Sequence, residues 1–331
     1  MRLFITGATG FIGASLLAYE KFGHHELVCL VRPDSRGIPI SPNNHLKVHR
    51  GLVSATDLKG CDAVIFLAGR AHIMRDSATD PLTENRAVNR DLALALAAMA
   101  IEASVPKYIY LSSVKAFGEA SAVVGTVVGE NDPSSPKDPY GISKREAEEG
   151  LARLYGGRHG VHCVVLRIPM VYGPGNKGNM LSLLKSASRG HRLPLGAAKR
   201  KRSMLYVENL CDAIVTILNR RSLSGIATYY LTDGDDMTSA GLYEEIYSAF
   251  GGHKGTYYMP EGIFRFVGII GSACERFLGQ SVPINAGVVS RLFNEFRFSS
   301  EKFRSDYGWQ PPVSFREGVR KTVKWFRTMG D

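Results

Sequence analysis

Three glycines at a fixed spacing follow the first apolar run of this chain and limit how it can fold. The run Leu3–Thr6 leads directly into Gly7, Gly10 and Gly13. Gly7 permits a tight turn, Gly10 lets backbone N–H groups approach an anion, and Gly13 lets a following helix pack closely on the strand. The amino end of that helix, expected from Phe11, adds partial positive charge. The pattern favours a loop that cradles the pyrophosphate of a dinucleotide, with a simple tight turn as the alternative.

Apolar runs of strand length alternate with helical patterns along the first half of the chain. Strands are expected at Leu3–Thr6, Glu26–Val31, Leu46–Val48, Ala63–Ala68, Tyr108–Ser112 and Val164–Ile168. Helices are expected at Phe11–Lys21, Pro81–Ala103 and Pro139–Tyr155. Because strands that alternate with helices form parallel sheets, the predicted fold class is α/β, a Rossmann-type doubly wound parallel sheet.

The alternation of strands and helices loosens after residue 172 and resumes between residues 205 and 232. We therefore predict that residues 1–172 and 205–232 together form an NAD(P)-binding domain. Residues 173–204 and 233–331 are expected to form a smaller, discontinuous lobe that binds the substrate. Within this lobe, the apolar stretch Ile263–Leu278 favours a lid or core helix over a helix at a membrane surface.

The composition excludes several classes of protein. Of the 331 residues, 44% are apolar, which is ample for a core, and no uninterrupted apolar run reaches the length of an integral membrane span. Threonine and glycine interrupt the first apolar run at once, so no secretory signal is expected. The five cysteines lack metal-ligand spacing. We therefore expect no bound metal, and free thiols in a reducing cytoplasm.

The net charge of +10 calls for an anionic partner. The densest cluster of cations is Lys199–Arg202. No helix-turn-helix, zinc-finger or aromatic RNA-binding pattern accompanies it, so nucleic acid is not expected as a partner. A substrate that contains a diphosphate would use the same positive field. For Lys199–Lys201 themselves, a solvated loop is the favoured interpretation.

Tyr140 and Lys144 are predicted to lie on one face of a helix. Asp138 and Pro139 supply an N-cap and a first-turn proline, and a spacing of four residues places both side chains on the same side. A phenol has a pKa near 10, so a base at neutral pH needs that value lowered by about 3 units. An ammonium group at roughly 4 Å can supply that amount. The alternative is an amphipathic tyrosine beside a solvated lysine.

A pair of serines ends the strand expected at Tyr108–Ser112. Ser112 and Ser113 should lie at the carboxyl edge of the sheet, where ligands bind in doubly wound folds. A hydroxyl group there can hydrogen-bond a reacting carbonyl oxygen and hold it for proton transfer. Ordinary turn serines are the alternative, and the glycine loop at the same edge makes that alternative weaker.

Together these motifs resemble the extended short-chain dehydrogenase/reductase family, and within it the nucleotide-sugar enzymes similar to UDP-glucose 4-epimerase. The matching segments are Thr6–Gly13, Leu67–Arg70, Asn89, Ser112–Ser113, Tyr140–Lys144, Arg167–Pro169, Tyr172–Gly175 and Tyr307–Pro312. The resemblance thus spans nearly the whole chain. It implies a UDP-sugar substrate and a homodimer joined through the helices at about 83–103 and 139–155.

The resemblance also implies roles for individual residues. Ser113, and not Ser112, matches the catalytic hydroxyl, and Tyr140 would donate or accept a proton at the sugar C4 oxygen. Lys144 would lower the pKa of Tyr140 and bind the nicotinamide ribose. The other residues that would contact the cofactor are Gly7, Thr9, Gly10, Phe11, Ile12, Ala68, Gly69 and Pro169. The residues that would hold the UDP moiety are Asn179 and Arg202, with Arg291 as a further candidate.

One departure from the family's pattern concerns the cofactor. NAD-binding members place an acidic residue at the end of the second strand, whereas here Arg32 follows Val31, with Arg36 close behind. An arginine can pair with the 2′-phosphate of NADP(H), which a carboxylate would repel. We therefore expect NADP(H) in preference to NAD(H). An arginine stacked on the adenine, the alternative, would favour neither.

Further details narrow the subfamily. Leu67–Met74 and Ser112–Lys115 are similar to segments of bacterial O-antigen and capsule enzymes, among them reductases of UDP-4-keto-6-deoxy-N-acetylhexosamines. This implies reduction at C4 for lipopolysaccharide synthesis. The alternative is a 4-epimerase of UDP-glucose or UDP-N-acetylglucosamine that retains NAD tightly. His72 and Arg75 are weaker substrate candidates, because a structural hydrogen bond is the simpler interpretation of a loop histidine. A nucleotide sensor without turnover would leave the serine, tyrosine and lysine unexplained.

Overall fold

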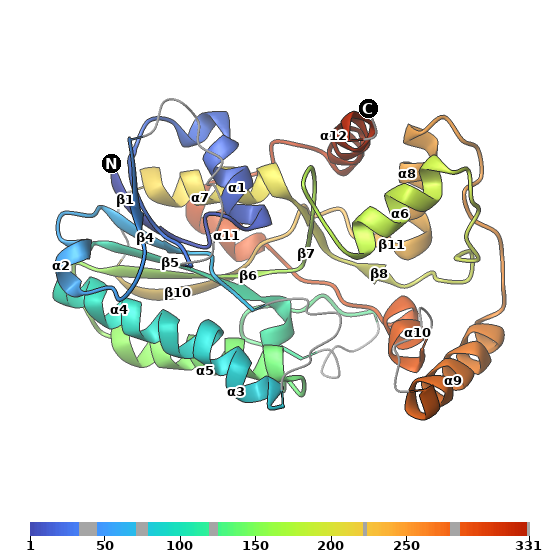
Figure 1. Cartoon of the computed structure of the whole chain (residues 1–331), viewed down its shortest axis with the longest axis horizontal. Helices are drawn as coiled ribbons and strands as arrows, with labels where there is room; N and C mark the ends of the chain where they lie inside the picture. Colours follow the sequence, from blue (N-terminus) through green and yellow to red (C-terminus); the bar gives the residue numbers. More distant parts are fainter. Residues whose placement is uncertain (33–44, 71–78, 119–124, 221–223, 279–284, 330–331) are drawn as a thin grey trace.

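A sheet of seven parallel strands forms the centre of the structure, a computed structural model that describes residues 1–32, 45–70, 79–118, 125–220, 224–278 and 285–329 (Figure 1). From one edge to the other, the strands are β10 (Gly225–Tyr230), β6 (His162–Ile168), β5 (Lys107–Ser113), β4 (Ala63–Phe66), β1 (Arg2–Thr6), β2 (Glu26–Leu30) and β3 (His45–His49). All six strands expected over the first half of the chain are confirmed, with ends within two residues of the predicted ones. The predicted doubly wound parallel sheet is therefore correct.

Helices cover both faces of this sheet, because a parallel strand buries side chains on both sides. Alternate residues of β1 serve different layers: Leu3 and Ile5 belong to one core cluster and Phe4 to the other. The first layer contains α1 (Phe11–Ala18), α7 (Val207–Asn219) and α11 (Glu301–Tyr307). The second contains α2 (Ala55–Leu58), α3 (Pro81–Arg86), α4 (Leu92–Glu102) and α5 (Pro139–Tyr155) (Figure 1).

The helix predicted over Pro81–Ala103 is not continuous. A π-helical stretch, Ala87–Asp91, separates α3 from α4. This wider turn carries Asn89, whose buried side chain bonds to groups outside the helix. The spacing of apolar residues does not reveal the extra residue of a π-helical turn. The sequence therefore predicts one regular helix, whereas the structure has three helical segments.

The other two predicted helices differ in outcome. The helix expected over Phe11–Lys21 ends at Ala18, because Tyr19 adopts an extended backbone and donates a hydrogen bond to Asp212 of α7 (2.8 Å). The helix predicted over Pro139–Tyr155 is confirmed as α5 with the same bounds.

The remaining elements form a second region beside the sheet. α6 (Asn179–Ser188), α8 (Ser239–Ala249) and α12 (Phe315–Thr328) share one apolar core. Two short sheets adjoin them, one of β7 (Met170–Tyr172) with β9 (Met204–Tyr206), the other of β8 (Lys201–Arg202) with β11 (Met237–Thr238). α9 (Glu261–Leu278) packs on α10 (Ala286–Phe293) at the opposite end of the molecule from α2 (Figure 1).

The division into 1–172 with 205–232, and 173–204 with 233–331, stays a prediction. Within the first unit, β10 joins the main sheet, whereas β9 pairs with β7 outside it. By sequence α11 belongs to the second unit, yet its Phe303 is buried in the core of the main sheet. A boundary at residue 233 would therefore separate α11 from the residues on which it packs.

The stretch Ile263–Leu278 is helical, as α9, but it is not a core helix. Phe264 and Gly268 are buried, and Gly268 lies close to Val289 of α10. The opposite face carries large apolar side chains at the surface, among them Phe266, which is 65% exposed. Among the described residues, no helix is long and apolar enough to cross a membrane.

Candidate active site

The parallel register brings the carboxyl ends of four central strands to one edge of the sheet. Thr6 of β1 pairs with Phe66 of β4, and Ser113 of β5 pairs with Ile168 of β6. The segments that follow these strands therefore emerge on the same side, which is where doubly wound folds bind their ligands. The glycine loop lies among these segments.

The glycine loop after β1 leaves no room for side chains at two positions. Gly7 has a φ of 73°, and a Cβ there would lie 2.7 Å from the backbone nitrogen of Ala68. A Cβ on Gly13 would collide with the carbonyl oxygen of Gly7. The turn, the first helix and the loop after β4 are therefore packed backbone to backbone.

The amino end of α1 fits an anion. Gly10 precedes the helix, and no side chain among the described residues caps it. The first-turn N–H groups have no partner within a helix, and the helix dipole favours negative charge beside them. The loop thus fits the pyrophosphate of NAD(P), and the residues that would hold it there are Gly7, Thr9, Gly10, Phe11 and Ile12.

Three further predicted cofactor residues lie at the same edge. The backbone nitrogen of Ala68 donates to Thr6 Oγ1 (3.1 Å), which ties the loop after β4 to β1. A Cβ on Gly69 would lie 3.8 Å from Lys144 Nζ, so this loop also reaches α5. Pro169 follows β6 directly and is buried.

Arg32 lies two residues beyond the end of β2. Because Leu30 pairs with Thr6, Arg32 emerges at the edge that carries the glycine loop. Its side chain is exposed, and its carbonyl oxygen accepts a hydrogen bond from Arg50 (3.2 Å). Three other residues considered from the sequence, Arg36, His72 and Arg75, lie outside the described residues.

The amino-terminal half of α5 carries Tyr140 and Lys144. Asp138 caps the helix through its side chain, and Pro139 occupies its first position, as the sequence predicts. Lys144 is buried, and its Nζ lies 6.0 Å from the centroid of the Tyr140 ring. The same Nζ donates a hydrogen bond to the carbonyl oxygen of Leu111 (2.7 Å).

The two serines at the end of β5 have different partners. Ser112 donates to Glu148 Oε1 (2.5 Å). Ser113 accepts a hydrogen bond from the backbone nitrogen of Lys115 (3.2 Å) and forms another with the Tyr140 side chain. The structure therefore brings Ser113 to Tyr140 and directs Ser112 to a separate buried group.

Burial dominates the electrostatics of this site. It raises the pKa of Tyr140 to about 12, against the lowering effect of the hydrogen bond with Ser113. It also lowers the pKa of Lys144 to about 7, and Glu148 opposes that change. The lowering of the Tyr140 pKa by Lys144 stays a prediction: in this structure the ammonium group donates its hydrogen bond to the Leu111 carbonyl oxygen, and burial determines the direction of the shift.

A buried ion pair lies one helical turn beyond Lys144 and was not predicted. Glu148 and Arg167, 6% and 5% exposed, are joined by a contact of 2.7 Å between Oε2 and Nη2. Arg167 also donates from Nη1 to the hydroxyl of Tyr230 (2.9 Å). Two sequence signals could have revealed the pair: the four-residue step from Lys144 to Glu148, and a charge inside the apolar run Val164–Ile168.

Asn89 connects the loop after β4 to α5. Its Oδ1 accepts a hydrogen bond from the backbone nitrogen of Arg70 (2.9 Å), and its Nδ2 donates to Ser143 Oγ (3.0 Å). Since Ser143 precedes Lys144, Asn89 fixes Gly69 and Lys144 relative to each other. From the sequence, Asn89 is only one of the positions that resemble the family, and no role is predicted for it.

The predicted substrate residues lie on three elements beyond the main sheet. Asn179 is the first residue of α6 and is exposed. Arg202 lies in β8, with its guanidinium carbon 5.9 Å from the ring centroid of Phe296. Arg291 lies in α10, and its side chain is outside the described set. Their role in binding a nucleotide stays a prediction.

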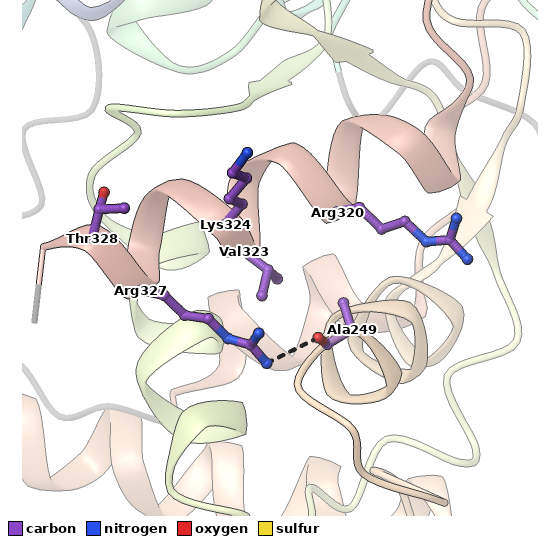
Figure 2. A pocket seen from close by; sticks show the side chains of 6 residues that line it. All are labelled: Ala249, Arg320, Val323, Lys324, Arg327 and Thr328. Carbon is purple, nitrogen blue, oxygen red and sulfur yellow. Dashed lines mark hydrogen bonds between the residues drawn. The ribbon is translucent and has the colours of Figure 1, made fainter.

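Two of the surface hollows among the described residues lie away from this edge. One of about 230 Å³ lies between α8 and α12, where Arg327 donates to the carbonyl oxygen of Ala249 (3.3 Å) (Figure 2). It is lined by Ala249, Arg320, Val323, Lys324, Arg327 and Thr328. The other, of about 450 Å³, is lined by Lys201, Gly234–Met237, Glu245, Arg297 and Ser314–Arg316. Neither hollow is lined by Ser113, Tyr140 or Lys144. The candidate site is therefore located by the carboxyl edge of the sheet and not by either hollow.

In the part of the chain that the structure describes, no group of three or more His, Cys, Asp or Glu side chains could hold a metal ion.

Replacing Glu148 with glutamine should destabilise the protein by about 3 kcal/mol or more, because Arg167 would remain buried with its charge unpaired. The matched control is Glu149→Gln on the same helix. Glu149 pairs with Arg145 at the surface, so its loss should change the free energy of unfolding by at most about 0.5 kcal/mol. Urea unfolding measures both values. Equal effects of the two substitutions would show that the buried pair does not stabilise the fold.

Comparison with known proteins identifies the family. The model of the NAD dependent epimerase/dehydratase family matches residues 3–228. A UDP-glucose 4-epimerase from Vibrio cholerae is 31% identical to this chain, over 98% of this chain and 95% of the relative. The N-acetyl-alpha-D-glucosaminyl-diphospho-ditrans,octacis-undecaprenol 4-epimerase of Escherichia coli O157:H7 is 25% identical, over 98% and 95%.

A solved structure adds evidence on the fold alone. The UDP-glucose 4-epimerase of Thermotoga maritima, crystallised with UDP-glucose, superimposes with a TM-score of 0.74 at 21% identity, and the match covers 100% of both chains. The family match and the Vibrio relative carry the argument further, since both span the glycine loop and the segment Ser113–Lys144. The chain therefore belongs to the NAD dependent epimerase/dehydratase family of extended short-chain dehydrogenases/reductases.

Proposed function

We propose that this protein reduces the 4-keto group of a UDP-4-keto-6-deoxy-N-acetylhexosamine with NADPH, in the cytoplasmic synthesis of a bacterial O-antigen or capsule. The observation that carries the choice of a reductase is Arg32, which emerges beside the glycine loop where an acidic residue would bind the ribose of NAD. A reductase consumes an exchangeable reduced dinucleotide once per turnover, and NADPH is the form that an arginine favours.

The chain's own residues supply the proton and the positioning. Bound NADPH would provide the hydride for C4 of the sugar. Tyr140 keeps its proton at neutral pH, since burial raises its pKa to about 12, and its hydroxyl donates that proton to the C4 oxygen. Ser113 hydrogen-bonds with Tyr140 and holds the same oxygen in place. Lys144, beside Gly69, would bind the nicotinamide ribose.

The nucleotide half of the substrate would bind in the second region of the chain. Asn179, Arg202 and Arg291 would hold the UDP moiety. The net charge of +10 supports attraction of this anion. We further propose that the protein is a homodimer joined through the helical segment at about 83–103 and through α5.

A UDP-hexose 4-epimerase with tightly bound NAD is the second candidate, and identity to the Vibrio enzyme favours it. In that case Tyr140 would first accept and then return the proton at the C4 oxygen. The name of the E. coli relative adds a lipid-linked N-acetylglucosamine diphosphate to the substrates that deserve an assay.

Two measurements separate the candidates. The first identifies any dinucleotide that the purified protein releases when it is denatured, and the second is a turnover assay. We expect little bound dinucleotide, and oxidation of NADPH in stoichiometric proportion to a supplied UDP-4-keto-6-deoxy-N-acetylhexosamine. Stoichiometric release of NAD, with conversion of UDP-glucose or UDP-N-acetylglucosamine and no NADPH oxidation, would establish the epimerase instead.

Tyr140→Phe should lower turnover by about 10²- to 10⁴-fold, because it removes the proton donor and leaves the ring in place. The matched control is Tyr155→Phe, which removes a buried hydroxyl at the far end of the same helix, where it bonds to the Ala97 carbonyl oxygen. Steady-state kinetics of both variants provide the measurement. Wild-type turnover of the Tyr140 variant would refute the assigned chemistry.

Arg32→Asp should reduce the ratio of NADPH to NADH efficiency at least tenfold, since a carboxylate repels the 2′-phosphate and accepts the ribose hydroxyls. Arg158→Asp makes the same change of charge at an exposed position outside the site, so it controls for the altered net charge. The ratio of kcat/KM values for the two cofactors gives the result. An unchanged ratio would show that Arg32 does not select the cofactor.

A further inference from the structure

α9 presents a continuous apolar face to the surface. The large apolar side chains Ile263, Phe266, Val267, Ile269 and Ile270 are all exposed, Phe266 by 65% and Ile269 by 64%. At 3.6 residues per turn they cover about 160° of the helix circumference. Isolated exposed apolar residues need no explanation, but a stripe of this width marks a surface that binds something.

The inner face of α9 is already occupied. Phe264 is buried with Ala198, Val289 and Phe293 in a small apolar cluster, and a Cβ on Gly268 would lie 2.9 Å from Val289. The outer stripe is therefore not a core surface that has separated from the protein. In Figure 1, α10 lies between α9 and the central sheet, so the outer face of α9 is at the end of the molecule.

Cations and tyrosine rings lie on segments that pack beside α9. Ala198 packs on Phe264, and the exposed cations Lys199 and Arg200 follow it directly. The segment 189–202 contains no acidic residue. Its cationic side chains are Arg189, Arg192, Lys199, Arg200, Lys201 and Arg202.

The loop before α9 adds Tyr257 and Tyr258. Tyr258 is 69% exposed, and the carbonyl oxygen of Tyr257 accepts a hydrogen bond from Gly196 (3.0 Å), which joins this loop to the cationic segment. Tyrosine at the border of an apolar surface is typical of a membrane interface, where the ring is buried and the hydroxyl stays in water.

We propose that the outer face of α9 docks on the surface of an anionic lipid bilayer. The apolar stripe would enter the region between head groups and acyl chains, and the exposed cations Lys199 and Arg200 would contact anionic head groups. Local charge favours this partner over a second copy: the segment 189–202 beside α9 contains no acidic residue, so anionic lipid complements it, whereas a copy docked through the same face would bring a second cationic segment against it.

Vesicle co-sedimentation of the full chain tests the proposal. Wild-type protein should bind vesicles of phosphatidylcholine with a quarter phosphatidylglycerol at least tenfold more tightly than vesicles of phosphatidylcholine alone. Phe266→Glu should weaken this binding at least tenfold. Leu52→Glu makes the same kind of change at a loop residue that is 98% exposed, and it should bind as wild type does.

Two further variants separate the apolar and electrostatic contributions. Phe266→Trp keeps a large apolar ring, so it should bind as wild type does and shift its fluorescence to shorter wavelength on vesicles. Lys199→Gln and Arg200→Gln should each weaken binding to the anionic vesicles about fivefold. All variants should keep the wild-type midpoint of urea unfolding, which shows that the fold is intact and keeps this test independent of the proposed function.

Two outcomes would overturn the proposal. One is wild-type protein that stays in the supernatant, or a Phe266→Glu variant that sediments with vesicles as wild type does. The other is a wild-type dimer, in analytical ultracentrifugation, that Phe266→Glu converts into a monomer without any vesicle binding. That result would assign the α9 face to a second copy of the chain.

Discussion

The candidate site depends on one constraint, the close approach of backbones at the carboxyl edge of the parallel sheet. Gly7 has to adopt a positive φ, and a Cβ on it or on Gly13 would enter the space of a neighbouring backbone. Only this packing lets α1 begin directly at the turn, with its amino end at the same edge as the loop after β4. The register of β1 with β4, and of β5 with β6, then brings Ser113 and the start of α5 to that edge. The site is thus built by backbone geometry before any side chain contributes.

Sequence patterns report this backbone geometry well, and contacts between distant side chains poorly. Each of the six strands and the whole of α5 could be predicted, because periodicity, Asp138 and Pro139 are local signals. The π-helical turn at Asn89 could not be predicted, because it depends on hydrogen bonds with two residues outside its own helix. These are Arg70, in the loop after β4, and Ser143, on α5. The effect of burial on the pKa of Tyr140 could not be predicted, for a related reason. Spacing shows that a lysine shares the helix face, but it shows neither how deeply the phenol is buried nor that the Leu111 carbonyl oxygen holds the ammonium group.

The buried pair of Glu148 and Arg167 lies beside Lys144 and acts on it through Glu148. Burial lowers the pKa of Lys144 to about 7, and Glu148 opposes this because its carboxylate lies one turn away on α5. Arg167 pairs with Glu148, and Ser112 donates a further hydrogen bond to the same carboxylate. Ser112, which matches no catalytic position, therefore helps to hold the group that opposes the fall in the pKa of Lys144.

The second region of the chain links the two proposals through α10. This helix has eight residues, too short to bend independently along its length. Its Val289 packs under Gly268 of α9, and its Arg291, two residues further on, is a predicted contact of the UDP moiety. Whatever fixes the outer face of α9 also fixes the backbone that carries Arg291. A docked α9 would therefore hold the nucleotide-binding side of the site at the lipid surface, while the glycine loop and Tyr140 stay with the central sheet. The orientation of the molecule on a membrane thus follows from the packing of one short helix between its neighbours.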